Sequence, residues 1–120
     1  MIKHHFNIFV VTLLLVFLNP LSGFALTKEI ADSCYRQGNY QQAISDYKAL
    51  LRQGVSSDLY YNLGNAYYRS DSLAQAILNY ERAYRLSPSD ADVKFNLQFA
   101  RSKTIDKITP ESDNFFVALY

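Results

Sequence analysis

One segment of this chain is repeated 33 residues further on. Residues 38–47 (GNYQQAISDY) align with residues 71–80 (DSLAQAILNY), and identical residues meet at Gln42, Ala43, Ile44 and Tyr47. A fixed period of this length is typical of an array of stacked units, because each unit buries its apolar face only against a neighbour. The repeat therefore restricts the fold more than any other feature of the sequence.

The repeated segments have the pattern of helices joined by tight turns. From Leu73 to Leu86, apolar residues recur every three or four positions, as on one face of a helix. Asn39 and Ser72 each stand three positions before a glutamine, which is the spacing of a helix-capping pair. Gly38 and Asp71 directly precede these caps, where the previous helix must end in a residue that tolerates positive φ. We expect each unit to be helix, tight turn, helix.

Other boundaries follow from the same reasoning. Gly54 is expected to end the second helix, and Ser56 or Ser57 to begin the third. Pro88 follows the fourth helix and cannot continue it. Ser89, with an acidic residue three positions later, is expected to cap a fifth helix over about residues 90–103.

This pattern resembles the tetratricopeptide repeat (TPR). The fullest match is residues 57–90, where the family's positions are occupied by Tyr60, Leu63, Gly64, Tyr67, Ala76, Tyr80, Ala83 and Pro88. Asp71 replaces the usual second glycine, and the first unit has Ile30-Ala31 in place of the Leu-Gly pair. The resemblance implies an all-α, TPR-type α-solenoid of stacked antiparallel helical hairpins, with about 2.5 repeats in five helices after an N-terminal signal helix. Its parts are a degenerate repeat (26–56), a full repeat (57–90), a closing helix (91–103) and a C-terminal tail (104–120).

The first 25 residues have the features of an export signal. Lys3 is the only charged residue before the apolar run over residues 6–18, and the small residues Gly23 and Ala25 occupy the places that signal peptidase requires. An uncleaved anchor is the alternative, since residues 6–26 are about long enough to span a bilayer. Either reading predicts an exported, periplasmic protein, membrane-attached if the anchor is kept.

Composition excludes several functional classes. Without Lys3, the 12 basic residues become 11, against 11 acidic residues, so no basic stripe for nucleic acid is expected. Both histidines, His4 and His5, belong to the signal. The remaining chain has Cys34 as its single thiol and no tryptophan. We expect no enzyme, no metal, no cofactor and no small-molecule substrate, and we expect Cys34 to be a small core residue.

The resemblance also predicts where a partner polypeptide binds. In TPR arrays the first helix of each unit lines a concave groove, and the predicted groove residues are Tyr61, Asn62, Asn65, Tyr68, Arg69, Phe95, Asn96 and Phe99. The asparagines offer donors and acceptors for a peptide main chain, and the aromatic residues offer apolar contact. Tyr61 and Phe95 occupy places where some family members carry the basic residues of a carboxylate clamp, so such a clamp is not expected.

A narrower resemblance concerns the C-terminal third. Residues 59–68, 76–83 and above all 92–108 look like the BatE-type aerotolerance-operon TPR proteins of Bacteroidetes. That resemblance implies a periplasmic scaffold that recruits an envelope or membrane protein in a complex for oxidative stress tolerance.

Three alternatives remain open at this point. The repeats are few, so they can instead form a structural or self-association module and a homo-oligomer. Asp90 and Asp92 are carboxylates of the kind an enzyme uses, although their place at a helix start explains them as caps. Cys34 is a redox candidate without a resolving cysteine.

Overall fold

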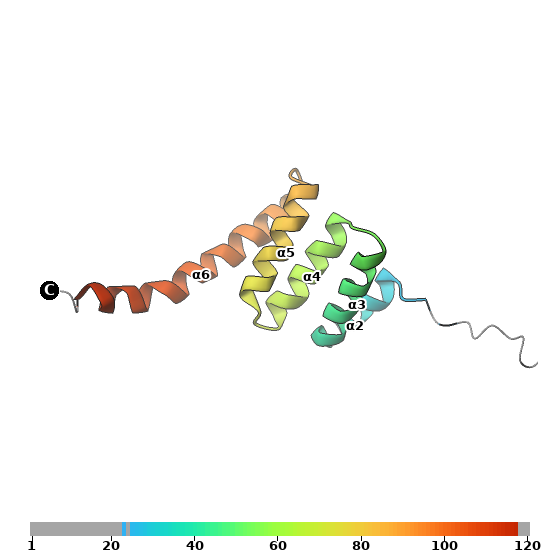
Figure 1. Cartoon of the computed structure of the whole chain (residues 1–120), viewed down its shortest axis with the longest axis horizontal. Helices are drawn as coiled ribbons and strands as arrows, with labels where there is room; N and C mark the ends of the chain where they lie inside the picture. Colours follow the sequence, from blue (N-terminus) through green and yellow to red (C-terminus); the bar gives the residue numbers. More distant parts are fainter. Residues whose placement is uncertain (1–22, 24, 118–120) are drawn as a thin grey trace, which may run out of the picture.

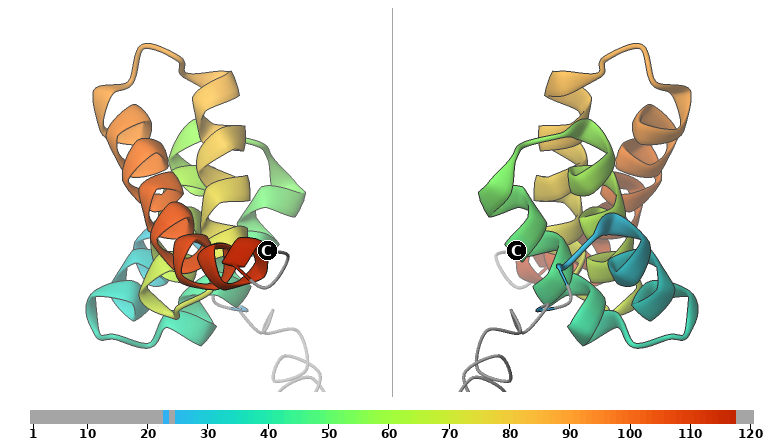
Figure 2. Two further views of the ribbon diagram at one scale, coloured as in Figure 1. Left: turned by 90° about the vertical axis from the view of Figure 1, so that its left-hand side faces the viewer. Right: turned by 90° about the vertical axis from the view of Figure 1, so that its right-hand side faces the viewer.

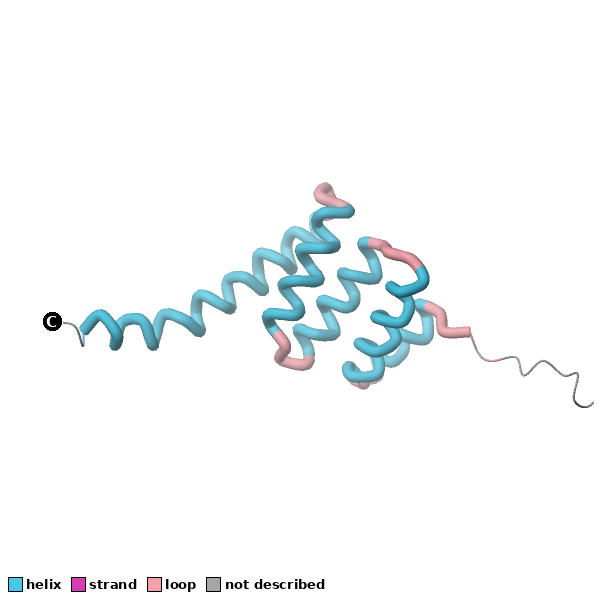
Figure 3. Tube along the Cα trace, in the orientation of Figure 1, coloured by secondary structure: helices cyan, strands magenta, loops and turns pink. Residues whose placement is uncertain are grey.

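Five helices and no strand make up the described part of the chain (Figures 1 and 3). The computed structural model describes residues 23 and 25–117, with side chains as far as Thr104. The helices are α2 (Lys28–Arg36), α3 (Tyr40–Gln53), α4 (Ser57–Arg69), α5 (Leu73–Leu86) and α6 (Ala91–Val117). The all-α hairpin array expected from the sequence is confirmed. The predicted signal helix lies outside the described residues.

Consecutive helices pack against each other throughout the array. α2 pairs with α3 and α4 with α5, while α3 against α4 and α5 against α6 join one hairpin to the next. The end-on views show α6 alongside α5 (Figure 2). Contact between α2 and α4 places the first helices of successive units on one side. No helix among residues 25–117 combines the length and the apolar character needed to cross a bilayer.

The turns inside the two hairpins have the same geometry, as the repeat predicts. Gly38 has φ 78° and Asp71 has φ 59°. In the first turn the Asn39 N–H donates to the Cys34 carbonyl at 2.9 Å, and in the second the Ser72 N–H donates to the Tyr67 carbonyl at 2.9 Å. These six-residue bonds close helices that end in a left-handed residue. The expectation of positive φ at both positions is confirmed.

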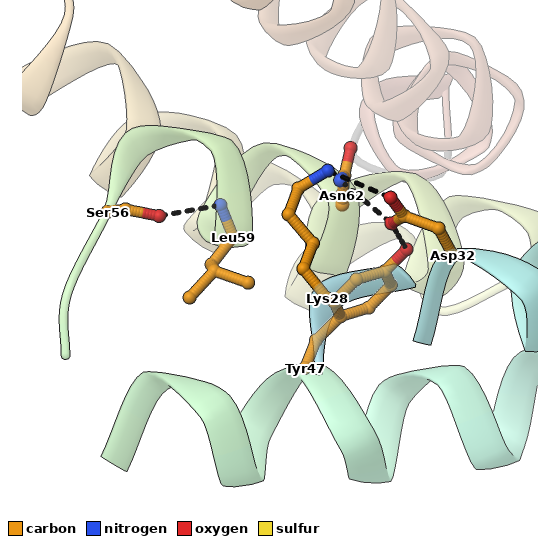
Figure 4. A network of polar contacts seen from close by, with 6 residues as sticks. All are labelled: Lys28, Asp32, Tyr47, Ser56, Leu59 and Asn62. Atoms are coloured by element: carbon orange, nitrogen blue, oxygen red, sulfur yellow. Dashed lines mark hydrogen bonds and ion pairs between the residues drawn. The ribbon is translucent and has the colours of Figure 1, made fainter. Parts of the chain in front are cut away.

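The predicted capping pairs at Asn39 and Ser72 are wrong. Both residues occupy the N-cap position, but neither side chain accepts a hydrogen bond there. Their ψ values of 68° and 67° are set by the preceding tight turn, whereas Ser56 is extended at ψ 151°. A capping side-chain oxygen typically turns toward the first helical turn from the extended conformation. The Leu59 N–H accordingly donates to the Ser56 hydroxyl at 3.1 Å (Figure 4).

Two further predictions about α6 are wrong. Asp90, not Ser89, caps the helix, because its Oδ1 accepts from the backbone N–H groups of Asp92 at 3.0 Å and Val93 at 3.2 Å. The helix also continues past Lys103 to Val117. Residues 104–109 contain neither glycine nor proline, so nothing in the sequence ends the helix at Lys103; Pro110 further on lacks a backbone N–H, and the helix nevertheless continues through it. The closing helix is thus longer than the predicted 91–103 and extends beyond the other helices (Figure 1).

Small residues bring the helices together. Two buried clusters form the core, one around Ala31, Ala43 and Tyr47 and one around Ala76 and Tyr80. Gly64 lies so close to α5 that a Cβ placed on it would be 2.7 Å from ring carbons of Tyr80. Gly64 and Ala76, two of the positions that carry the resemblance to the repeat family, therefore meet in a close contact between α4 and α5.

Candidate functional site

The first helices of successive units are tied together by a half-buried carboxylate. Asp32 of α2 accepts hydrogen bonds through Oδ1 from the Tyr47 hydroxyl of α3 and, at 3.3 Å, from the Asn62 amide of α4 (Figure 4). Its other oxygen, Oδ2, pairs with the Lys28 ammonium at 2.8 Å. One side chain of the first unit thereby joins both helices of its own hairpin to the first helix of the next.

The second unit repeats this arrangement with an amide in place of the carboxylate. Asn65 stands 33 residues after Asp32, and its Oδ1 accepts from the Tyr80 hydroxyl at 2.7 Å and from the Asn96 amide at 3.0 Å. The Asn96 amide also donates to the Tyr61 hydroxyl at 3.0 Å. Each acceptor, Asp32 or Asn65, thus binds one tyrosine hydroxyl and one asparagine amide. We call these two equivalent sets of hydrogen bonds the inter-repeat ties. They are not among the features predicted from the sequence.

These ties correct the role expected for the asparagines. Asn62, Asn65 and Asn96 were expected to offer all their polar atoms to a bound peptide, but each already forms a hydrogen bond within the array. Because removing a buried partner leaves the opposite group unsatisfied, a variant that truncates Asn65 would loosen the stacking of the repeats as well as any binding site. The asparagines cannot therefore serve as neutral probes of binding.

Burial ensures that the tyrosine hydroxyls of the two ties act as hydrogen-bond donors. It raises the pKa of the Tyr47 hydroxyl, and the adjacent Asp32 carboxylate raises it further. It also raises the pKa of the Tyr80 hydroxyl. Both hydroxyls therefore keep their protons, which the acceptors Asp32 and Asn65 require.

The carboxylate tie predicts a pH-dependent contribution to stability. Burial acts to raise the pKa of Asp32, but the hydrogen bonds from Lys28 and Tyr47 outweigh it and lower that pKa below the ordinary 3.8. A lowered native pKa gives stability that is present above 3.8 and is lost as the pH falls through the native value. Asp32→Asn retains an oxygen acceptor, as Asn65 does, and loses only the partly exposed Lys28 pair.

We expect Asp32→Asn to lower the free energy of unfolding by no more than about 1 kcal/mol at neutral pH. As the pH falls from 3.8 through the lower native pKa of Asp32, the difference between wild type and Asp32→Asn should narrow and then vanish, because protonation removes the same charge. Urea unfolding of both proteins across this range measures the difference. A gap that stays constant or widens on acidification would contradict the assignment.

The predicted groove residues gather around one cavity of about 220 Å³ between α4 and α6. We call it the α4–α6 groove, and its lining consists of Tyr35, Asn65, Tyr68, Arg69, Tyr80, Phe95, Asn96 and Phe99. Six predicted residues line it, whereas Tyr61 and Asn62 do not. Tyr35 also lines it, as its place on the concave face of the first helix, 33 positions before Tyr68, predicts, whereas Tyr80 was not predicted as a site residue.

Exposed aromatic rings dominate the mouth of this groove. Phe95 is 66% exposed and Phe99 is 42% exposed, and their rings stack in parallel with centroids 6.2 Å apart. Tyr68 packs against Phe99 from α4, with ring centroids 5.9 Å apart. Large apolar side chains left open to water in this way are typical of a surface that a partner covers.

Cations and open polar atoms flank the rings. The Arg69 guanidinium lies over the Tyr40 ring at 5.2 Å, and the Lys103 ammonium lies over the Phe99 ring at 5.0 Å. Among the described residues, Asn65 Nδ2 donates to no group and Asn96 Oδ1 accepts from none. The lining thus offers the main chain of a bound peptide one side-chain donor and one side-chain acceptor, beside the apolar surface of the rings.

Cys34 is half-buried against the first core cluster, not fully buried as a core residue would be. Burial and the neighbouring Asp46 carboxylate raise the pKa of its thiol. The thiolate is the reactive form, so this environment disfavours redox chemistry at Cys34. Residues 25–104 include no group of three His, Cys, Asp or Glu side chains arranged to hold a metal ion.

Comparison with known proteins agrees with the architecture. The family model described as tetratricopeptide repeat matches residues 28–91. Tetratricopeptide repeat protein 16 of Macaca fascicularis and that of Homo sapiens are each 33% identical to this chain over 76 residues, which is 62% of the chain. The chain spans 9% of the length of either relative.

Proposed function

This chain belongs to the tetratricopeptide repeat family, and from that premise we propose that it is a scaffold whose α4–α6 groove holds a segment of another polypeptide. Repeats of this family are generally non-catalytic and typically bind polypeptides. The observation that carries the proposal is the cavity of about 220 Å³ beside the exposed rings of Phe95 and Phe99. Its lining residues come from α2, α4, α5 and α6, so it exists only because the repeats stack.

The proposed contacts assign separate tasks to the lining residues. Apolar side chains of the partner pack on Phe95 and Phe99, which supply most of the buried area. A peptide group donates its N–H to Asn96 Oδ1 and accepts from Asn65 Nδ2. Each such bond contributes about 0.5–1.5 kcal/mol net. Arg69, held over the Tyr40 ring, favours a carboxylate or carbonyl oxygen at one end of the groove.

We further propose that this partner is an envelope or membrane protein. The apolar run over residues 6–18 and the small residues Gly23 and Ala25 support export through a cleaved signal, with an uncleaved anchor as the alternative. The resemblance of residues 92–108 to BatE-type proteins supports a periplasmic complex for oxidative stress tolerance. Fractionation of cells that express the full chain tests export, and a protein found only in the cytoplasm would end this part of the proposal.

The groove itself is tested with two matched double variants of the full chain. Phe95→Ala/Phe99→Ala removes the exposed rings of the groove, whereas Val55→Ala/Leu86→Ala removes side chains that are 62% and 51% exposed and lie outside it. In a quantitative pull-down from envelope extracts, the first variant should recover at least about tenfold less of the partner, as expected for interface anchors. Equal recovery by both variants would contradict the proposal.

Self-association is the second candidate function. The large exposed fractions of Phe95 and Phe99 on the last helix favour it, since a second copy would cover them. Measuring the size of the purified chain at several concentrations separates the two. A dimer that forms without any added protein, and that Phe95→Ala/Phe99→Ala abolishes, would favour self-association over a peptide ligand.

A further inference from the structure

A second groove lies between α3 and α5, the second helices of the two hairpins. It has a volume of about 460 Å³, and none of its lining residues belongs to the α4–α6 groove. Leu63 and Asn79 at its base are buried, and Leu51, Tyr60 and Tyr67 are half-buried. Lys48, Arg52 and Arg82 line it as exposed side chains. We call it the α3–α5 groove.

The charged side chains that line the α3–α5 groove are all positive. Its lining includes three cations and no carboxylate. Asp46 and Glu81 are the only acidic residues of the two helices, and both are engaged elsewhere. Asp46 bonds with the Gln42 amide at 2.8 Å, and Glu81 pairs with Arg101 of α6 at 2.7 Å.

The three cations are therefore available to a ligand. Within residues 25–104, neither Lys48 nor Arg52 nor Arg82 forms an ion pair. Arg82 is held in place by the Tyr60 ring, with its guanidinium carbon 5.7 Å from the ring centroid. A positioned guanidinium loses less freedom when it binds a carboxylate than a mobile one does.

Asn79 gives an independent sign of a missing partner. It is 2% exposed, and its amide nitrogen donates to the Gln75 carbonyl at 2.8 Å, but its Oδ1 is buried without a hydrogen bond in the described part of the chain. The equivalent residue of the first hairpin, Asp46, is satisfied by Gln42. Gln75 corresponds to Gln42, yet its side chain forms no such bond. A donor from outside the chain, such as a peptide N–H, would satisfy this oxygen once a shift of the Asn79 side chain exposes it to the groove.

We propose that the α3–α5 groove binds a short acidic segment of a polypeptide in extended conformation. Its carboxylates face Lys48 and Arg52 on one wall and Arg82 on the other, its apolar side chains contact the half-buried tyrosines, and one backbone N–H donates to Asn79 Oδ1. Gln75 to Arg82 covers roughly 10 Å of helix, which about three extended residues match. This site adds a second binding surface on the opposite helices and does not depend on the α4–α6 groove.

The test uses the isotope-labelled full chain and a capped hexapeptide of alternating glutamate and leucine as the probe. Addition of the probe should shift the backbone NMR signals of Lys48, Arg52, Leu78 and Arg82. The control hexapeptide, with glutamine in place of glutamate, should bind at least about tenfold more weakly because it lacks the charge-assisted contacts. Shifts centred on Phe95 and Phe99, or equal binding of both peptides, would overturn the assignment.

Two double variants show whether the site or the net charge is responsible. Lys48→Ala/Arg52→Ala should weaken binding of the acidic probe about tenfold, since two carboxylate partners are lost. Arg85→Ala/Lys94→Ala removes the same charge from the neighbouring surface and should leave affinity unchanged. Alanine is well tolerated at exposed helix positions, so both variants fold. An equal loss in both, or binding of anionic phospholipid vesicles that Lys48→Ala/Arg52→Ala abolishes, would overturn a peptide site.

Discussion

Tyr80→Ala is expected to lower the free energy of unfolding by about 3–5 kcal/mol, the range for truncation of a large buried aromatic residue. Tyr80 is 2% exposed, and its ring fills the space between α4 and α5 next to Gly64. Its hydroxyl also donates to Asn65, which ties α4 to α6. Truncation therefore removes both the ring that joins one hairpin and part of the polar tie to the next helix.

Two companion variants separate these contributions. Tyr80→Phe keeps the ring and should lose only about 0.5–1.5 kcal/mol, because Asn65 retains its bond from Asn96. Phe95→Ala removes a ring that is 66% exposed and should lose less than about 1 kcal/mol. Urea unfolding followed by circular dichroism measures all three. If Tyr80→Ala proved no more destabilising than Phe95→Ala, the described core would be incorrect.

Gly64→Ala is expected to destabilise the array by about 1–3 kcal/mol through overpacking. Alanine normally favours a helix over glycine by up to about 1 kcal/mol, but here the added Cβ would lie 2.7 Å from two Tyr80 ring carbons and 3.3 Å from the Ala76 carbonyl oxygen. The buried ring cannot move away without disturbing Asn65. The steric cost therefore exceeds the gain in helix propensity.

Gly54→Ala provides the matched control. Nothing lies within 4 Å of a Cβ built there, and its φ of −178° is extended backbone that any residue adopts. This substitution should leave stability unchanged or raise it by about 0.4–1 kcal/mol. Thermal or urea unfolding compares the two variants. Stabilisation of both to a similar degree would contradict the close contact between α4 and α5.

The sequence predicted the fold well because its decisive signals are local. The 33-residue offset, the small residues at Gly64 and Ala76, and the turn residues Gly38 and Asp71 each constrain neighbouring backbone directly. Prediction failed where the backbone next to a motif prevented the contact that the spacing of the motif implies. Ser72 has the spacing of a cap, but the tight turn before it sets its backbone so that the hydroxyl cannot reach the helix.

The polar ties could not be predicted with the same certainty, because they join residues about 15 and 30 positions apart. Whether Asn96 reaches Asn65 depends on how one hairpin stacks on the next, which no local pattern encodes. The same holds for the site: the helix face predicts Phe95 and Phe99 in the groove, whereas no local pattern predicts that Tyr80 also lines it. The offset that relates Asp32 to Asn65 and Tyr47 to Tyr80 was nevertheless present in the sequence.

Site-specific photocrosslinking tests most directly whether the α4–α6 groove holds a polypeptide. A benzophenone amino acid replaces Phe95 in one full-length protein and Val55, which is 62% exposed and lies outside the groove, in another. After irradiation in cells, position 95 should yield a discrete adduct with another polypeptide and position 55 should not. Absence of an adduct at position 95, or the same adduct at both positions, would contradict the account.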